Sequence, residues 1–125
     1  MQKYFFIALG GALGSMARYL VGTSISDRLG IRFPYATLII NLSACMIIGL
    51  SLEILNRHTN VNPAFRYLIP IGFIGAYSTF STFEWELFSN LNSGAFWVAL
   101  LYVATSLVFG LVAVALGAAL GRVLS

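Results

Sequence analysis

Long hydrophobic runs separated by short polar breaks dominate the pattern of this chain. An α-helix needs about 20 mostly apolar residues to cross a bilayer, and four runs meet that requirement. They cover residues 4–25, 34–55, 67–91 and 95–121. Pro34 suits the first turn of the second helix. The pattern therefore predicts an all-α membrane protein, with four transmembrane helices in a single domain over residues 1–125.

The composition agrees with this prediction, because 59% of the residues are hydrophobic and only 9% are charged. Soluble domains carry roughly a quarter charged residues. The basic residues are scattered singly, whereas a nucleic-acid surface needs a basic stripe. The excess of basic residues fits anchoring at the headgroups of membrane lipid. We therefore expect lipid and no nucleic acid as a partner.

The beginning of the chain has some features of a signal peptide, but its apolar run continues past Arg18 to about Ile25. A cleavable leader usually stops sooner, so we expect this segment to remain in the mature protein.

Cys45 lies in an apolar run and is expected to be a packed thiol. His58 lies in a polar loop and is expected to be solvated.

The third run is irregular, because Pro70, Gly72 and Gly75 weaken helix continuity. They precede the sequence Ser-Thr-Phe-Ser-Thr-Phe-Glu at residues 78–84. At membrane depth, each unsatisfied polar group costs several kcal/mol, and broken helices occur where their free backbone groups line a site. The pattern predicts a break in the helix near residues 75–79. The alternative is a kinked helix whose own hydroxyls satisfy its backbone.

The distribution of basic residues bears on the orientation in the membrane, which normally follows an excess of Lys and Arg on the cytoplasmic side. With the N-terminus in the cytoplasm, four basic residues lie inside: Lys3, Arg57, Arg66 and Arg122. Arg28 and Arg32 lie outside, and Arg18 is closer to that end. Because the two sides nearly balance, the chain could insert in both orientations and pair antiparallel with its own copy.

Several residues within the spans could line a path for a small anion. Phe80 and Phe83 share one face of a helix, and the edges of their rings are electropositive. Asn41 offers amide donors without a trapping charge. Further hydroxyls come from Tyr102 and Ser106 on the fourth span and from Ser81 and Thr82 on the third. We interpret this set as a thin, nearly uncharged path for a dehydrated anion.

Other interpretations remain open at this point. Asn41 could form an interhelical hydrogen bond, and Arg18 could extend its charge to the interface instead of acting directly. The sequence holds no catalytic motif, so we do not expect an enzyme. A small drug/proton exchanger is an alternative, but it needs an intramembrane carboxylate, which the first span lacks. A subunit without transport activity is a further alternative.

Three segments of the chain carry distinctive motifs: GGALGSMARY at 10–19, FPYATLIINLSACMIIG at 33–49 and GFIGAYSTFSTFEWE at 72–86. Together they resemble the Fluc/CrcB family of fluoride channels. The resemblance runs over the whole chain. It implies a dual-topology antiparallel homodimer in the bacterial inner membrane, with two pores that export cytoplasmic fluoride passively and relieve its toxicity.

The resemblance also assigns roles to single residues. It implies that Phe80 and Phe83 contact fluoride by their ring edges, that Asn41 is a pore donor, and that the hydroxyls named above line the pore. It further implies a structural sodium ion (Na⁺) at the dimer interface, held by backbone carbonyls at Gly75 and Ser78. The role of Arg18, in the first-helix motif, stays open. The chain departs from the family pattern at Ala36, Ala44, Ala76, Ser78 and Gly110.

Overall fold

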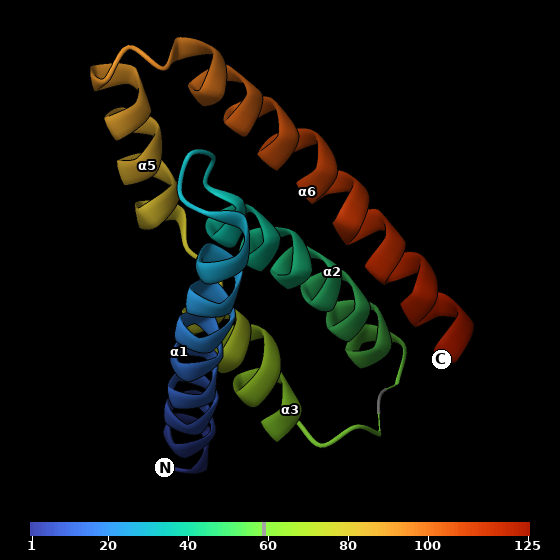
Figure 1. The fold of residues 1–125 in the computed structure, drawn as a ribbon. Coiled ribbons are helices and arrows are strands. Elements are labelled where there is room, and N and C mark those ends of the chain that lie inside the picture. The colour runs from blue at the N-terminus through green and yellow to red at the C-terminus, as the bar shows by residue number, and fades with distance from the viewer. Residues whose placement is uncertain (59) are drawn as a thin grey trace.

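Helices make up nearly all of the computed structural model, which describes residues 1–58 and 60–125 (Figure 1). No strand occurs in these residues. The helices in chain order are α1 (Gln2–Leu29), α2 (Tyr35–Arg57), α3 (Ala64–Arg66), η1 (Tyr67–Ile74), α4 (Gly75–Tyr77), α5 (Phe80–Asn92) and α6 (Phe96–Leu124). The predicted all-α class is confirmed.

Three of these helices, α1, α2 and α6, are long and apolar enough to cross a membrane by themselves. They correspond to the first, second and fourth predicted spans. The remaining span, predicted at 67–91, consists of η1, α4 and α5 in succession. The run was long enough in sequence, but its irregular backbone divides it into shorter helices.

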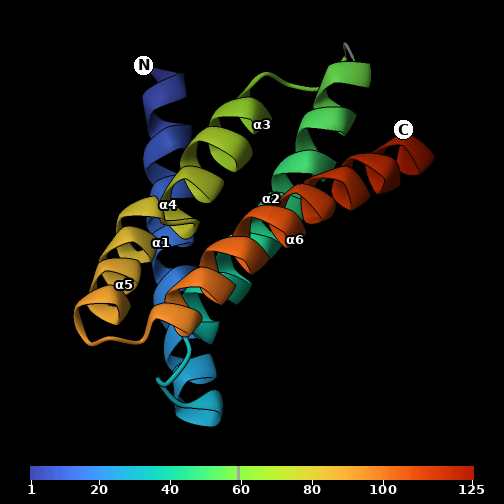
Figure 2. The same cartoon turned by 90° about the horizontal axis from the view of Figure 1, so that it is seen from above.

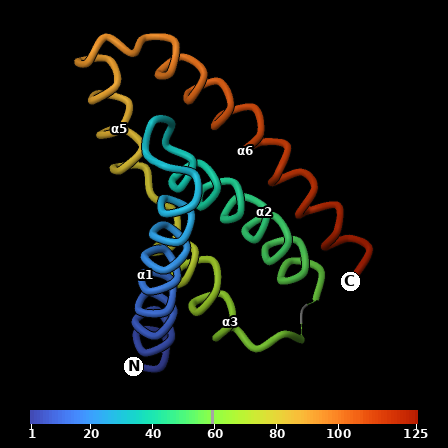
Figure 3. The backbone as a smooth tube through the Cα atoms, in the orientation of Figure 1, coloured from blue at the N-terminus to red at the C-terminus, as the bar shows by residue number. Residues whose placement is uncertain are grey.

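The division of the third span lies where the sequence predicts it, at residues 78–79. The π-helix η1 contains Pro70, and α4 adds a short α-helical stretch after it. Ser78 then has φ −74° and ψ 158°, and Thr79 has φ −150° and ψ 119°, both outside the helical region. Figure 3 shows this non-helical step before α5. The break is therefore a true interruption of the helix and not a kink.

Glycines set the closest contacts between helices. A Cβ on Gly14 of α1 would collide with the carbonyl oxygen of Phe73 in η1, and one on Gly117 of α6 would collide with the carbonyl oxygen of Met46 in α2. The ribbons of α2 and α6 accordingly run side by side in both views (Figures 1 and 2). Such close approach of backbones is typical of small residues between membrane helices.

Both termini lie toward one end of the molecule, together with the end of α2 and the beginning of α3 (Figure 1). Polar contacts connect the helices at this end. Glu53 Oε1 lies 2.7 Å from Arg57 Nε and 3.3 Å from Arg122 Nε, which links α2 to α6. Arg66 Nη2 donates to the carbonyl of Leu55 at 2.6 Å. The turns at 30–34 and 93–95 lie toward the opposite end.

Candidate anion site at the helix break

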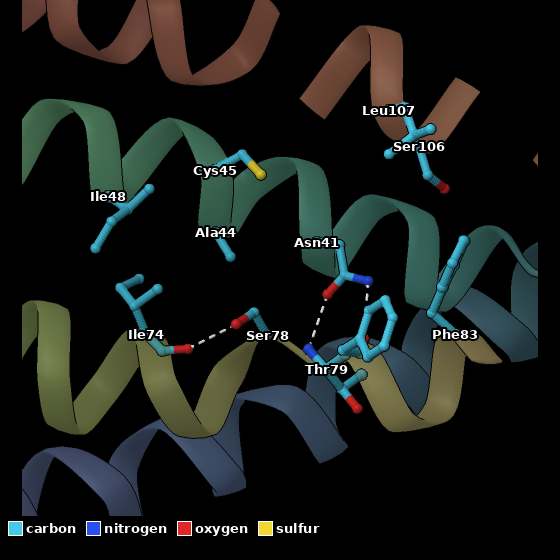
Figure 4. Close-up of a pocket in the computed structure, with 11 residues that line it drawn as sticks. Asn41, Ala44, Cys45, Ile48, Ile74, Ser78, Thr79, Phe83, Ser106 and Leu107 are labelled. Carbon is cyan, nitrogen blue, oxygen red and sulfur yellow. Dashed lines mark hydrogen bonds between the residues drawn. The ribbon is translucent and has the colours of Figure 1, made fainter. Parts of the chain in front are cut away.

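A cavity of about 300 Å³ lies at the helix break and is lined by residues of α2, the third span and α6 (Figure 4). No charged side chain is among the described residues that line it. They are Asn41, Ala44, Cys45, Ile48, Ile74, Ser78, Thr79, Phe80, Phe83, Ser106 and Leu107. The cavity thus brings together five of the predicted site residues, Asn41, Ser78, Phe80, Phe83 and Ser106, which come from three different spans.

Asn41 of α2 holds the break through two hydrogen bonds to one residue. Its Oδ1 accepts from the backbone N–H of Thr79 at 2.9 Å, and its Nδ2 donates to the carbonyl of Thr79 at 3.0 Å (Figure 4). The amide group has two N–H donors, so one remains for another acceptor. The interhelical role considered from the sequence is therefore present, and a donor at the cavity wall is still available.

Thr79 caps the start of α5 and forms hydrogen bonds with neighbouring groups of that helix. Its Oγ1 accepts from the backbone N–H of Thr82 at 3.3 Å and donates to Thr82 Oγ1 at 3.0 Å. Such a cap satisfies one of the free amides at a helix start. Ser81 and Thr82 are exposed and line neither this cavity nor the other cavities described. The hydroxyl-bearing residues that the third span brings to the cavity are instead Ser78 and Thr79, at the break between α4 and α5.

The break also frees backbone carbonyls. The N–H of Thr79 donates to Asn41, and the N–H of Thr82 donates to the Thr79 side chain. In a continuous helix, these two N–H groups would bond to the carbonyls of Gly75 and Ser78. Gly75 is exposed, and a Cβ there would meet nothing within 4 Å. The two positions predicted for sodium are thus the two whose helical donors are used elsewhere.

The two predicted phenylalanines are neighbours that differ in exposure. Their ring centroids are 6.0 Å apart, with an interplanar angle of 32°. Phe83 is buried, and its ring centroid lies 4.8 Å from that of Tyr102 on α6. Phe80 also lines the cavity, yet 74% of it is exposed. One ring is therefore enclosed by this chain, and the other faces outward.

The two predicted hydroxyls of α6 behave differently. Ser106 Oγ is buried and has no hydrogen-bond partner among the described residues, although its residue lines the cavity. A buried hydroxyl without a partner is rare and costs stability. Tyr102 is fully buried and donates to Glu86 Oε2 at 2.7 Å. Ser106 is thus a free donor at the cavity, whereas the hydroxyl of Tyr102 is already engaged.

A second cavity, of about 450 Å³, lies near the turn at 30–34, and Glu86 is among its lining residues. The other oxygen of this carboxylate, Oε1, accepts from Thr37 Oγ1 at 2.8 Å.

Sequence reasoning did not assign Glu86, Thr37 or Thr79 to the site. A signal existed, because Glu86 follows Phe83 by three residues and Thr37 precedes Asn41 by four, which places each pair on one helix face.

The remaining predictions concern residues farther from the rings. Arg18 is partly buried on α1 and lines neither cavity. Cys45 is partly buried and forms part of the first cavity's wall. His58 is exposed after the end of α2, as expected for a solvated side chain.

Comparisons with known proteins agree with these observations. Residues 5–118 match the family described as "CrcB-like protein, Camphor Resistance (CrcB)". The chain is 52% identical over 121 residues to a fluoride-specific ion channel FluC of Acidobacterium capsulatum, with 97% of each chain covered. It is 46% identical over 121 residues to a protein of the same name from Solibacter usitatus, with 97% of this chain and 99% of the relative covered.

Proposed function

The chain belongs to the CrcB family, and we propose that it is a fluoride-selective channel that exports cytoplasmic fluoride by passive electrodiffusion. The family is one of ion channels and not of enzymes. The apolar helices and the relatives fit a multi-pass bacterial membrane protein. Export through the inner membrane would reduce the toxicity of fluoride. The observation that carries the proposal is the uncharged cavity at the break, where amide, hydroxyl and aromatic groups converge.

The chemistry of this cavity suits a small anion that has lost water. Removing an ion from water is costly, so a path must offer several replacement donors and still release the ion. The second N–H of Asn41 and the unpartnered hydroxyl of Ser106 are such donors. The electropositive ring edges of Phe80 and Phe83 add weaker attraction. Among the described residues that line the cavity, none is a lysine or arginine that could trap the ion.

Other residues extend the proposed path beyond the cavity. Ser81 and Thr82 are exposed at the start of α5, beside the outward-facing Phe80. Tyr102 can serve the ion only when its hydroxyl leaves Glu86. Arg18 is partly buried away from both cavities, which favours a structural role in α1 over direct contact with fluoride.

We further propose that two copies pair antiparallel and form two fluoride pores. The exposure of Phe80 supports this, because a ring that lines the cavity lies mostly outside the chain's own fold. A second copy would cover this ring and close the site. The near balance of basic residues at the two ends supports insertion in both orientations.

A structural Na⁺ between the two copies is the last part of the proposal. The carbonyls of Gly75 and Ser78 fit such a cation, because their helical donors are used elsewhere and Gly75 is exposed. Unwound backbone carbonyls are common ligands for sodium in membrane proteins. Crystals of the dimer grown with thallium in place of sodium should show anomalous density between these carbonyls. Density for water alone would remove the sodium from the proposal.

The main test is fluoride efflux from proteoliposomes that contain the purified protein. Liposomes loaded with potassium fluoride and treated with a potassium ionophore should release fluoride, measured with a fluoride electrode. Without the ionophore, release should stop, because electrodiffusion of an anion stops when its charge is not balanced. Matched liposomes loaded with chloride should retain their anion. Absence of fluoride release from folded protein would contradict the proposed function.

A further inference from the structure

The carboxylate of Glu86 lies at the second cavity, and among the described residues its hydrogen-bond donors are two hydroxyls. Thr37 donates to one of its oxygens at 2.8 Å, and Tyr102 donates to the other at 2.7 Å. Both ion pairs found in the described part of the chain involve Glu53 instead. This carboxylate therefore accepts hydrogen bonds from two neutral hydroxyls that could equally donate to a passing anion.

The location of Glu86 links it to both cavities. Its own side chain lines the second cavity, near the turn at 30–34. Its partner Tyr102 packs against the ring of Phe83, with centroids 4.8 Å apart, and Phe83 lines the first cavity. An anion that moves between the two cavities along this wall meets the hydrogen bond between Glu86 and Tyr102.

The hydrogen-bond directions restrict what these hydroxyls can do. Each hydroxyl has a single proton to donate, and both protons point to the carboxylate of Glu86. A fluoride ion can bind to Thr37 or Tyr102 only if it replaces the carboxylate as acceptor. Hydrogen bonds to charged oxygens are strong, so only an anion that is itself a strong acceptor competes well.

We propose that Glu86 is a tethered anion that occupies the hydroxyls of Thr37 and Tyr102 between ion passages and yields them to fluoride. This inference rests on the proposed channel function and adds a residue that determines specificity. The carboxylate keeps the two donors from water and from weak acceptors such as chloride. Fluoride then exchanges with it, and the donors return to Glu86 when the ion has left.

Two substitutions at the ends of one hydrogen bond test this idea. Glu86→Gln removes the competing charge, so the fluoride concentration that gives half-maximal flux should fall by about tenfold, equivalent to about 1.4 kcal/mol. Tyr102→Phe removes the contested donor, so the same concentration should rise. The matched control Glu84→Gln neutralises an exposed carboxylate that lines neither cavity, and it should leave this concentration unchanged.

Opposite shifts of the half-maximal fluoride concentration in the two variants would show that Glu86 competes with fluoride for the Tyr102 hydroxyl. A hydrogen bond that only supports the fold would not give opposite shifts. If Glu86→Gln and Tyr102→Phe shift the half-maximal concentration in the same direction, the bond is only structural and the inference is wrong. An unchanged concentration in Glu86→Gln would also overturn it. Wild-type protein is measured in the same assay, and only a lack of flux there would count against the channel function itself.

Infrared difference spectroscopy of the wild-type protein covers the case in which a variant fails to fold. Adding fluoride should shift a carboxylate stretching band, because Glu86 loses two hydrogen-bond donors, and adding chloride should not. The shift should persist in Glu84→Gln. A spectrum in which fluoride changes no carboxylate band would overturn the proposal.

Discussion

At the scale of single residues, the two aromatic rings of the site differ in exposure, because Phe83 is buried and Phe80 is exposed. The buried ring contacts Tyr102 and is fixed by this chain. The exposed residue, Phe80, has 74% of its surface accessible, so the position of its ring depends on the partner that covers it. Substitutions at the two positions should therefore differ in their effect on the fold, although both should affect the passage of the anion.

Replacing either phenylalanine with isoleucine keeps an apolar side chain but removes the electropositive ring edge. We expect Phe80→Ile and Phe83→Ile each to lower fluoride flux by at least about tenfold, equivalent to about 1.4 kcal/mol. The matched control is Phe88→Ile on the same helix, because Phe88 is exposed and lines neither cavity. Fluoride efflux from proteoliposomes measures the effect, and unchanged flux in folded variants would contradict the role given to the rings.

At Ser106, the effect of one hydroxyl on fluoride flux can be distinguished from its effect on the stability of the fold. Its buried hydroxyl has no partner among the described residues, and such a group costs about 1–3 kcal/mol of stability. We therefore expect Ser106→Ala to unfold at the same or a higher temperature than the wild type, while fluoride flux falls several-fold because a donor is lost.

Ser43→Ala is the matched control for that experiment. Ser43 Oγ donates to the carbonyl of Ile40 at 2.9 Å and lies 2.9 Å from the hydroxyl of Tyr77. Removing it leaves the buried Tyr77 without this partner, so the unfolding temperature should fall. A loss of stability in Ser106→Ala as large as that in Ser43→Ala would show that the Ser106 hydroxyl supports the fold.

At the scale of helices, the packing of α1 on η1 holds the irregular half of the third span in place. Gly14 lies directly against the backbone of Phe73. We expect Gly14→Ala to lower the free energy of unfolding by about 1–3 kcal/mol, the usual cost of overpacking, and to lower fluoride flux because η1 leads into the break. Thermal unfolding and efflux measure the two effects.

Gly11 provides the control on the same helix, because a Cβ there meets nothing within 4 Å. Alanine is a better helix former than glycine by about 1 kcal/mol, so Gly11→Ala should be neutral or stabilising. If both variants behave alike, close contact at Gly14 does not hold η1.

The break itself could be predicted from the sequence, but the inward-facing hydroxyls could not. Pro70, Gly72 and Gly75 each disfavour a regular helix, and these local effects can be read from the chain. The extended backbone at residues 78–79 changes the direction in which the side chains of the following helix point, relative to those of the preceding helix. The rule that residues three or four apart share a face therefore cannot be carried across residues 78–79. The rule holds within α5, where Phe80 and Phe83 line the cavity while Ser81 and Thr82, between them, are exposed. Ser78 and Thr79 line the cavity from the extended step itself.

The partner of Tyr102 shows a second limit of sequence reasoning. The spacing of Tyr102 and Ser106 predicted one face of α6, and the structure places Ser106 at the cavity. The direction of the Tyr102 hydroxyl depends on Glu86 of α5, which contacts α6 across the turn at 93–95. Such a contact is tertiary, and no local pattern in either helix specifies it.

At the scale of the whole molecule, the weak charge asymmetry has a direct consequence for the membrane. Positive residues normally retain one end of a protein in the cytoplasm. The end with both termini carries Lys3, Arg57, Arg66 and Arg122, whereas Arg28 and Arg32 lie at the opposite end, with Arg18 closer to that end. The excess of basic residues is small, so neither orientation is strongly favoured.

We therefore expect each end of the chain to face the outside in about half of the molecules. In a Cys45→Ser background, Ser125→Cys places a thiol at the exposed C-terminus, and Ser93→Cys places one in the exposed turn before α6. A membrane-impermeant thiol reagent added to intact cells should label roughly half of each variant, since antiparallel pairing needs equal numbers of both orientations. Permeabilised cells should allow complete labelling. Full labelling of one variant together with none of the other would show a single orientation, and an antiparallel dimer could not then form.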